Sequence, residues 1–474
     1  MIRRTMVPSS SPFPSELPTP SPAKGRHHRD WTEGSIIGNL WSLSWPMTVS
    51  ALVEQLGPTI DMIWMGRLGS TAMAGVGVAG LAVMVLVAAR QGLNIGIRAI
   101  LARAVGAKDL LEANRVTQQA LIISAFFGLF MAAVGIFFSE AILRLLGVSP
   151  AVVKQGASYM RIQLIGSFFM SFAMMARGIM QASGDAVMPM KISLATRTLH
   201  VVLSPFLIFG WWIFPRLEVN GAALTNLIAE GILGAGVGWW ILFSGRSRLK
   251  PTLHQFRPDI GLLWRMIRVG LPSSLTGMER GFAHLFIVWF IAPFGTVALA
   301  AHSLIQRIDI VFHMPALGVG QAAGVLAGQN LGAGRADRAA KTGWTAAASY
   351  SALMVLMSVM VWFFGENLIR LFNNEPELVR MANTFLRIQI VDYLVFGVVV
   401  VLMYCLNGVG DTMVPMLTTF GTIWLIQIPL AHFLPQWTDW GVYGVRWAMV
   451  TGIVLRAVIY SIYFKGGWWK TRKV

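Results

Sequence analysis

Two carboxylates flank a proline in one strongly apolar stretch near the start of the chain. Residues 51–66 read ALVEQLGPTIDMIWMG and include Glu54, Pro58 and Asp61. Glu54 and Asp61 are seven residues apart, so in a helix they lie two turns apart on the same stripe. Burial and a second carboxyl nearby both favour the protonated form of a carboxylic acid. Such a pair is suited to hold a proton near neutral pH and to release it when water enters.

Pro58 adds a backbone group to this site. Proline has no N–H to donate to the carbonyl four residues earlier, which here belongs to Glu54. We therefore expect the helix to bend at Pro58 and the Glu54 carbonyl to be free beside the two carboxyls. A charge inside a membrane costs about 2.5–3.5 kcal/mol on insertion scales, so ionisable residues there are usually functional. The alternative is that Glu54 lies at the helix end, in water, without a role.

The elements that position these residues are expected to be membrane-spanning helices. The chain has 474 residues, of which 55% are hydrophobic and 12% are charged, whereas soluble domains carry about 25% charged residues. The apolar character extends along almost the whole chain, and at roughly 20 residues per span there is room for about a dozen spans. The sequence therefore predicts an all-α polytopic membrane protein and excludes a large soluble enzyme.

The net charge of +17 does not require nucleic acid as a partner. Lys and Arg gather in cytoplasmic loops, and basic residues here collect in the first thirty residues, in the linker 244–259 and in residues 465–473. We therefore expect both termini in the cytoplasm, membrane lipids around the chain, and no nucleic acid.

The single cysteine, Cys405, excludes an internal disulfide and a Cys-based metal site. No metal and no other cofactor is expected.

Twelve apolar runs form two sets of six that are related by an internal duplication. One constant offset in residue number pairs Pro46 with Pro272, Gly106 with Gly332, Glu140 with Glu366, Arg144 with Arg370, Pro150 with Pro376 and Arg161 with Arg387. Each copy holds an even number of spans, so the halves share one orientation and are related by a pseudo-two-fold axis along the membrane normal. For the recurring Arg161 and Arg387 we expect an architectural role.

The duplication also sets the expected domain boundaries. They are a disordered basic Pro/Ser-rich tail over 1–38, an N-terminal six-helix lobe over 39–243, a linker over 244–259, a C-terminal six-helix lobe over 260–464 and a basic tail over 465–474. Two parallel halves that enclose a site near the midplane are typical of secondary transporters. The chain lacks a GxxxxGK[ST] loop, HExxH and GxSxG, which argues against nucleotide-driven transport and against a membrane enzyme.

Several motifs, in their order, resemble the prokaryotic members of the multidrug and toxic compound extrusion (MATE) family. They are IDMIWMGRLGSTAMAGVGVA (60–79), APFGTVALAAHSLIQRI (292–308) and AGQNLGAGRADRA (327–339). The resemblance covers about residues 40–464. It implies an efflux antiporter of the bacterial inner membrane that exchanges H⁺ or Na⁺ for small, often cationic organic molecules and so confers antibiotic resistance. We expect such a protein to be a monomer and not an enzyme.

The resemblance places Asp61 at the first-helix aspartate of the family's N-terminal cation site. One subgroup carries Asn and Asp four residues apart before a proline, where this chain has His200 and Ser204, and Asn226 replaces a sixth-helix threonine. Na⁺ prefers oxygen ligands, for which an imidazole is a poor substitute, and histidine titrates near neutral pH. We therefore favour proton coupling, with Asp61 as the carrier and His200 or Glu54 as its partner. Simple packing of His200 in a helix interface is the alternative.

The C-terminal half has different charges at the equivalent positions. Arg280 is equivalent to Glu54, and no acid is equivalent to Asp61. Glu279 is adjacent to Arg280, for which we expect an ion pair with a neighbouring helix. Related sequences also carry a tenth-helix aspartate that is replaced here, and Asp392 lies one turn earlier on nearly the same face. A Na⁺ site of that second kind is therefore not expected.

A polar stripe runs along the predicted eighth span. Its members are His302, Gln306, Asp309 and His313, spaced four, three and four residues apart. If the stripe faces the space between the halves, it could bind a polar substrate or relay protons. If it faces another helix, its hydrogen bonds join the two helices.

Two other transport functions fit the sequence. One is a Na⁺-coupled exporter of the same fold. The other is a flippase for lipid-linked precursors with a related fold, which would need extra spans or a strongly cationic cleft; Arg280 and Arg307 keep that alternative open.

Overall fold

The computed structural model describes residues 30–145, 147, 149–247, 249, 251–253 and 256–472. Most of the tail predicted to be disordered, residues 1–29, lies outside this range. The first helix begins at Ile36, three residues before the expected start of the lobe, because the Ser35 hydroxyl caps it by accepting a hydrogen bond from the Gly38 N–H at 3.3 Å.

Among the described residues, the first half of the chain forms six long helical segments. Five are single helices and the sixth is continuous through a π-helical turn: α1 (Ile36–Leu68), α2 (Ser70–Gly106), α3 (Leu110–Leu145), α4 (Pro150–Ala182), α5 (Val187–Phe209), and α6 (Val219–Asn226) with η1 (Leu227–Leu233) and α7 (Gly234–Phe243).

The second half forms six more. They are α8 (Ile260–Ile291), α9 (Thr296–Gly332), α10 (Ala336–Arg370), α11 (Pro376–Gly408), a segment made of α12 (Met413–Phe420), η3 (Gly421–Gln427) and α13 (Ile428–Trp437), and α14 (Val442–Gly466). A short 3-10 turn, η2 (Ala292–Phe294), joins α8 to α9.

Eleven of the twelve segments are long and apolar enough to cross a membrane. The exception is α8, which carries four ionisable side chains, Arg265, Arg268, Glu279 and Arg280, besides His284. Across the described residues the fold is the predicted one, an all-α membrane protein with twelve long helices.

The duplication is visible in the helix boundaries. The offset that pairs Gly106 with Gly332 carries both bounds of α2 onto those of α9, and both bounds of α4 onto those of α11. The π-helical turns break the match, because η1 lies in the sixth segment of the first half whereas η3 lies in the fifth of the second half. π-helical turns occur frequently at functional sites. The different positions of η1 and η3 therefore indicate that the two halves differ in their functional sites.

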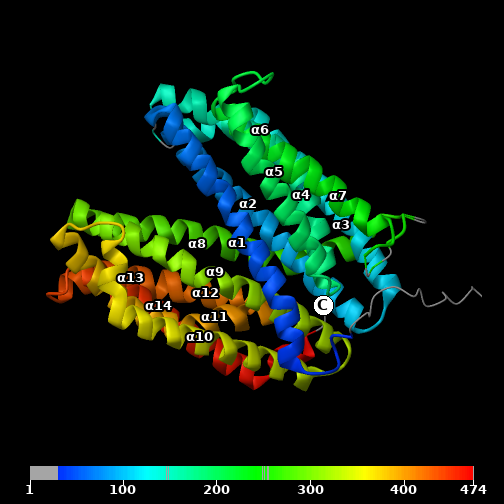
Figure 1. Cartoon of the computed structure of the whole chain (residues 1–474). Coiled ribbons are helices and arrows are strands. Elements are labelled where there is room, and N and C mark those ends of the chain that lie inside the picture. Colours follow the sequence, from blue (N-terminus) through cyan, green and yellow to red (C-terminus); the bar gives the residue numbers. More distant parts are fainter. Residues whose placement is uncertain are drawn as a thin grey trace, which may run out of the picture. The chain divides into compact units, whose positions relative to one another are not determined.

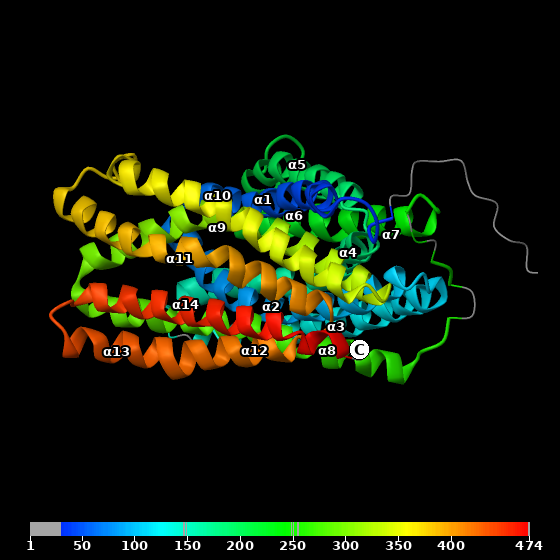
Figure 2. The same cartoon turned by 90° about the horizontal axis from the view of Figure 1, so that it is seen from below.

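The two halves meet through α1, α2, α8 and α9 (Figures 1 and 2). A Cβ at Gly92 of α2 would lie 2.1 Å from the Ser274 backbone nitrogen of α8, and a Cβ at Gly106 would lie 1.9 Å from the Gln329 carbonyl oxygen of α9. The absence of a side chain at these glycines therefore lets the helices touch. Both contacts lie in the second half of α2.

Helix α1 takes part in both halves. It packs against α5 in its own half and against α9 in the other (Figure 1). Near its start, Thr48 lies so close to α9 that a Cβ at Gly318 would be 2.1 Å from the Thr48 hydroxyl. A change in how the second half of α1 packs can therefore alter the contact between the lobes.

The basic segment after the last span is partly structured. The 3-10 turn η4 (Trp468–Thr471) follows α14, and Trp469 is fully buried with its indole donating to the Phe464 carbonyl at 2.9 Å. The Arg472 carbonyl accepts a hydrogen bond from Arg103 at 2.9 Å. This segment therefore packs against the end of α2.

Candidate functional site

Asp61 is buried inside the first half and is hydrogen-bonded at both carboxylate oxygens. Only 3% of the residue is exposed. Its Oδ1 lies 3.0 Å from His200 Nε2, and its Oδ2 accepts a hydrogen bond from Asn226 Nδ2 at 3.0 Å. The three side chains come from α1, α5 and α6, so the site joins three spanning segments.

Local structure explains the positions of the partners. His200 lies on the fully buried face of α5, with Ser204 one turn later and Pro205 after it. Asn226 is the last residue of α6, immediately before the π-helical turn η1. A π-helical turn rotates the side chains that follow it relative to their directions in an α-helix. Asn226 is therefore the last residue before the side chains of this segment change direction.

The geometry suits transfer of a proton. A proton between Asp61 and His200 can be held by either group at a 3.0 Å separation, because a carboxylate accepts from an imidazole N–H and a carboxylic acid donates to a neutral imidazole nitrogen. The Asn226 amide donates a hydrogen bond to the other carboxylate oxygen. His200 Nδ1 and Ser204 Oγ are buried without a hydrogen-bond partner in the described part of the chain.

Glu54 does not join Asp61, although both lie on α1. Two turns of helix separate them by about 10 Å along the axis. The Glu54 side chain is 44% exposed, and its carboxylate lies 3.7 Å from Arg177 Nε. The Ser193 hydroxyl donates to it at 3.4 Å. The expected carboxyl pair is therefore wrong, because the stripe that they share is longer than the reach of the two side chains.

The carbonyl freed by Pro58 is occupied by an arginine. Arg197 Nη2 of α5 donates to the Glu54 carbonyl at 3.2 Å and lies 3.1 Å from Glu230 Oε1. The guanidinium crosses α1 at Gly57, where an added Cβ would lie 1.8 Å from Arg197 Nη1. Gly57 is thus the gap in α1 through which Arg197 reaches the carbonyl.

Sequence reasoning missed this second cluster. Arg177 lies 3.9 Å from Glu230, and Thr196 donates to Glu230 at 3.3 Å. Glu230, Arg177 and Arg197 all fall inside predicted spans, and an ionisable residue within a span is itself a signal of function or pairing. That signal could have singled out these three residues, but it gives no indication of which of them pair.

In the second half, the polar stripe of α9 divides between two neighbouring helices. Asp309 accepts a hydrogen bond from the Tyr393 hydroxyl of α11 at 2.6 Å. His313 Nε2 lies 3.3 Å from Asp392 Oδ2, also on α11, and Gln389 donates to the same oxygen at 3.0 Å. The contacts of Asp309 and His313 join α9 to α11.

The earlier part of the stripe contacts α8 instead. Gln306 Nε2 lies 3.0 Å from His302 Nε2 and 3.0 Å from His284 Nδ1 of α8. His302 is buried. These contacts, like those of Asp309 and Asp392, fit the alternative in which the stripe joins helices.

Glu279 and Arg280 do not behave as a pair. Glu279 is buried, and its Oε1 has no hydrogen-bond partner among the described residues. Arg280 is exposed, and its Nη2 contacts the Met403 sulfur at 2.8 Å. The ion pair expected for Arg280 is absent from the described chain, because the group that it meets on α11 is a thioether.

Arg446 of α14 is a further buried cation that the sequence did not single out. It is 1% exposed, its guanidinium lies 4.5 Å above the Phe385 ring, and its nitrogens have no hydrogen-bond partner in the residues described. It is within electrostatic reach of Asp309 and Asp392. Arg446 thus adds a buried cation from a third helix near Asp309 and Asp392.

Comparison with known proteins identifies the same unit twice in the chain. The family model MatE matches residues 46–206 and again residues 272–433. The two matches fall in the two halves defined by the duplication.

Relatives extend over nearly the whole chain. The probable multidrug resistance protein YpnP of Bacillus subtilis is 24% identical over 446 residues, which cover 94% of this chain and 98% of that protein. An FAD transporter of Shewanella oneidensis is 22% identical over 406 residues, which cover 85% of this chain and 88% of that protein. A crystal structure of MATE in the bent conformation has the same fold, with a TM-score of 0.86 and 24% identity over 92% of this chain and 96% of the other.

Proposed function

This chain belongs to the MatE family of transporters, and from that premise we propose that it exports small organic molecules in exchange for protons by alternating access. The observation that carries the proposal is the buried Asp61 carboxylate, held between His200 and Asn226. Relatives named as multidrug resistance proteins support export of varied organic molecules. We propose Asp61 as the proton carrier and His200 as its partner, with Asn226 and Ser204 as polar neighbours.

The partners of Asp61 favour H⁺ over Na⁺. Both of its oxygens face nitrogen atoms, of His200 and Asn226, whereas a hard cation needs several oxygen ligands. Ser204 Oγ, one turn after His200, is buried without a hydrogen-bond partner among the described residues. The groups that contact the Asp61 carboxylate contribute nitrogen atoms rather than the oxygen ligands of a Na⁺ site, while a proton needs only the carboxylate.

Helix α1 supplies the link between proton binding and movement of the lobes. Its second half holds Asp61 against α5 and α6, and its first half touches α9 of the other lobe at Thr48. Protonation of Asp61 removes the negative charge that the Asn226 amide contacts and leaves a neutral hydrogen bond to His200, which frees α1 to change its packing. With both termini in the cytoplasm, as we propose, the observed lobe contacts close the cytoplasmic side.

Transport with separate gradients tests the coupling ion. The full chain is reconstituted in vesicles, and efflux of a fluorescent organic substrate is driven by a proton gradient without Na⁺ or by a Na⁺ gradient at equal pH on both sides. We expect transport with the first and none with the second. Transport driven by Na⁺ alone would overturn the proton assignment and favour the Na⁺-coupled alternative.

A second candidate class of substrate is organic anions. The cluster around Glu54 includes Arg177, Arg197 and the partly buried Arg90, against Glu54 and Glu230 as the acids, so arginines outnumber carboxylates. One relative is named an FAD transporter. Efflux of paired cationic and anionic dyes of similar size would decide between the two classes; we retain cations as the first expectation.

The flippase alternative is weaker. It predicted extra spans, and the described residues contain twelve long helices, the number of the predicted exporter. Arg280, one of the two arginines that kept this alternative open, contacts the Met403 sulfur of α11 at 2.8 Å.

A further inference from the structure

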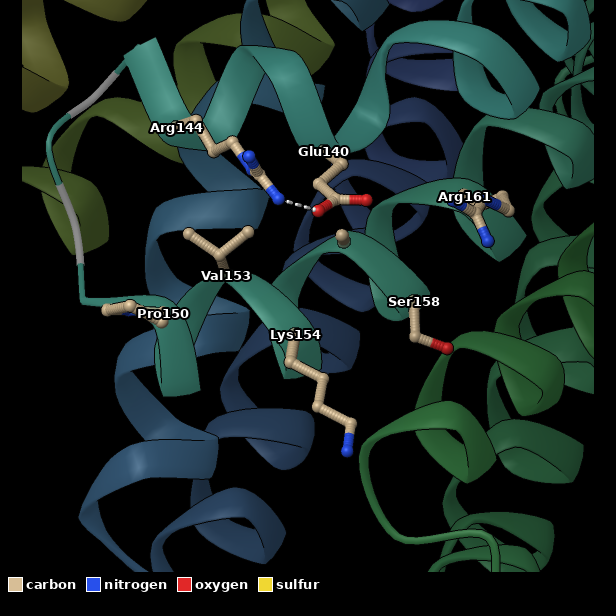
Figure 3. A pocket seen from close by; sticks show the side chains of 8 residues that line it. Glu140, Arg144, Pro150, Val153, Lys154, Ser158 and Arg161 are labelled. Carbon is tan, nitrogen blue, oxygen red and sulfur yellow. Dashed lines mark hydrogen bonds and ion pairs between the residues drawn. The ribbon is translucent and has the colours of Figure 1, made fainter.

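A pocket of about 650 Å³ lies between the end of α3 and the start of α4 (Figure 3). Three of its lining side chains are basic, Arg144, Lys154 and Arg161, and one is acidic, Glu140. Figure 3 shows Arg144 and Glu140 facing each other on α3, with Lys154 and Arg161 on α4. None of these residues contacts Asp61, His200 or Asn226, so the pocket takes no part in the coupling site.

The pocket has an excess of positive charge. Arg144 Nη2 pairs with Glu140 at 2.5 Å. Neither Lys154 nor Arg161 has an acidic partner within the part of the chain that the structure describes, and both side chains are exposed. Two positive charges are therefore available to an anion from outside the protein.

The same set of charges recurs in the second half. Arg370 pairs with Glu366 at 2.7 Å, as Arg144 pairs with Glu140. The offset between the halves also carries Lys154 onto Arg380, and Arg161 onto Arg387. The coupling residues diverged between the halves, with Arg280 in place of Glu54, whereas these basic residues kept their charge. Both halves therefore share a requirement that is separate from coupling.

An exposed apolar stripe leads to each set of charges. Phe130 and Phe137 lie on the same side of α3 as Glu140, at helical spacing, and both are exposed. Their counterparts on α10, Leu356 and Phe363, are exposed as well. From Phe130 to Glu140 the helix rises about 15 Å, which is half of the roughly 30 Å hydrocarbon core of a bilayer. The stripe has the length of the acyl chains of one leaflet.

We propose that the pocket in the first half, and the equivalent charges in the second, each bind the phosphate of an anionic phospholipid whose acyl chains lie along the neighbouring apolar stripe. The lipid phosphate neutralises Lys154 and Arg161 in the first half, and Arg380 and Arg387 in the second. A free phosphate ion would use the charges alone, whereas the stripe adds apolar contact that only a lipid satisfies. One lipid at each lobe would hold the ends of α3 and α10 at the level of the headgroups.

Native mass spectrometry of the full chain tests this proposal. The protein is purified with phosphatidylglycerol and phosphatidylcholine in equal amounts, and the bound lipids are counted. We expect two retained phosphatidylglycerol molecules in the unchanged protein, one in K154Q/R161Q, and none when R380Q/R387Q is added. Removal of each positive charge should lower retention about fivefold, since a basic residue near an anionic lipid contributes about 1 kcal/mol.

Matched variants separate this site from general charge effects. R115Q/K341Q removes two exposed basic residues from the other ends of α3 and α10, and should leave both lipids bound. K154R/R161K keeps the charges and should also retain both. Unchanged phosphatidylglycerol retention in K154Q/R161Q, with an unchanged melting temperature, would overturn the proposal. Full displacement of the lipid by millimolar glycerol 3-phosphate would overturn the lipid assignment in favour of a soluble phosphate.

Discussion

His200 Nε2 lies 3.0 Å from Asp61 Oδ1, in a contact between two buried side chains that are 139 residues apart in the chain. An acid and an imidazole at this distance form a unit that can lose or gain one proton without leaving an isolated charge in the membrane. Asn226 donates to the other carboxylate oxygen. The unit lies where α1, α5 and α6 meet, so its charge influences the packing of three helices.

Asp61→Asn should abolish coupling while leaving the fold intact. The amide has nearly the same shape but cannot ionise, so we expect proton-gradient-driven efflux to fall at least tenfold. Substrate binding, measured by fluorescence in detergent, should change by less than threefold. Asp337→Asn is the control, because Asp337 is an exposed carboxylate paired with Lys470 at 2.8 Å, and it should transport normally. Full gradient-driven efflux by Asp61→Asn would show that another group carries the proton.

His200→Gln should change the pH dependence of transport more than its maximal rate. Glutamine can still donate a hydrogen bond to Asp61, but it cannot accept a proton from the carboxyl group as a neutral imidazole can. We expect the efflux rate of the unchanged protein to vary between pH 5.5 and pH 8 and that of His200→Gln to vary much less. Initial rates in vesicles at constant proton gradient, from pH 5.5 to pH 8, provide the measurement. If both pH profiles have the same shape, His200 serves only in packing.

Gly57→Ala should destabilise the protein by displacing Arg197. The added methyl group would lie 1.8 Å from Arg197 Nη1, so the guanidinium must leave the Glu54 carbonyl and Glu230. Overpacking of this kind costs about 1–3 kcal/mol, and we expect a lower melting temperature in detergent. Gly66→Ala on the same helix is the matched control, because nothing lies within 4 Å of its added Cβ. Equal melting temperatures for the two variants would contradict the position of Arg197.

Tyr393→Phe should leave the partly buried Asp309 carboxylate without its hydroxyl donor. The present hydrogen bond is 2.6 Å long, and an unsatisfied buried acceptor costs about 1–3 kcal/mol. We expect the loss in thermal stability to disappear when Asp309 is also replaced by leucine, since the orphaned acceptor is then gone. Tyr443→Phe serves as the control, because Tyr443 packs its ring against Phe385. A Tyr393→Phe protein as stable as the control would mean that the Asp309 contact contributes little.

Much of the fold follows from periodicity and repetition. Apolar runs longer than roughly 20 residues are typical of membrane spans, and the offset that pairs Gly106 with Gly332 also relates the bounds of α2 and α9. The start of α1 at Ile36 lies before the predicted start of the lobe at residue 39, because it depends on the Ser35 cap rather than on hydrophobicity. The π-helical turns η1 and η3 have no signal in the sequence pattern, since they depend on how neighbouring helices pack.

The sequence by itself determined that Asp61 lies in a membrane span and that Pro58 frees the Glu54 carbonyl, because both facts depend only on local composition and on the missing N–H of proline. Only the tertiary structure decided which groups contact the Asp61 carboxylate and the free Glu54 carbonyl. His200 contacts Asp61, and Arg197 donates a hydrogen bond to the Glu54 carbonyl. The Glu54 carboxylate lies beside Arg177. Helical spacing places residues on a stripe but cannot say which distant helix faces that stripe. That choice is made by close packing across the bundle, where one missing side chain, at Gly57, admits a guanidinium.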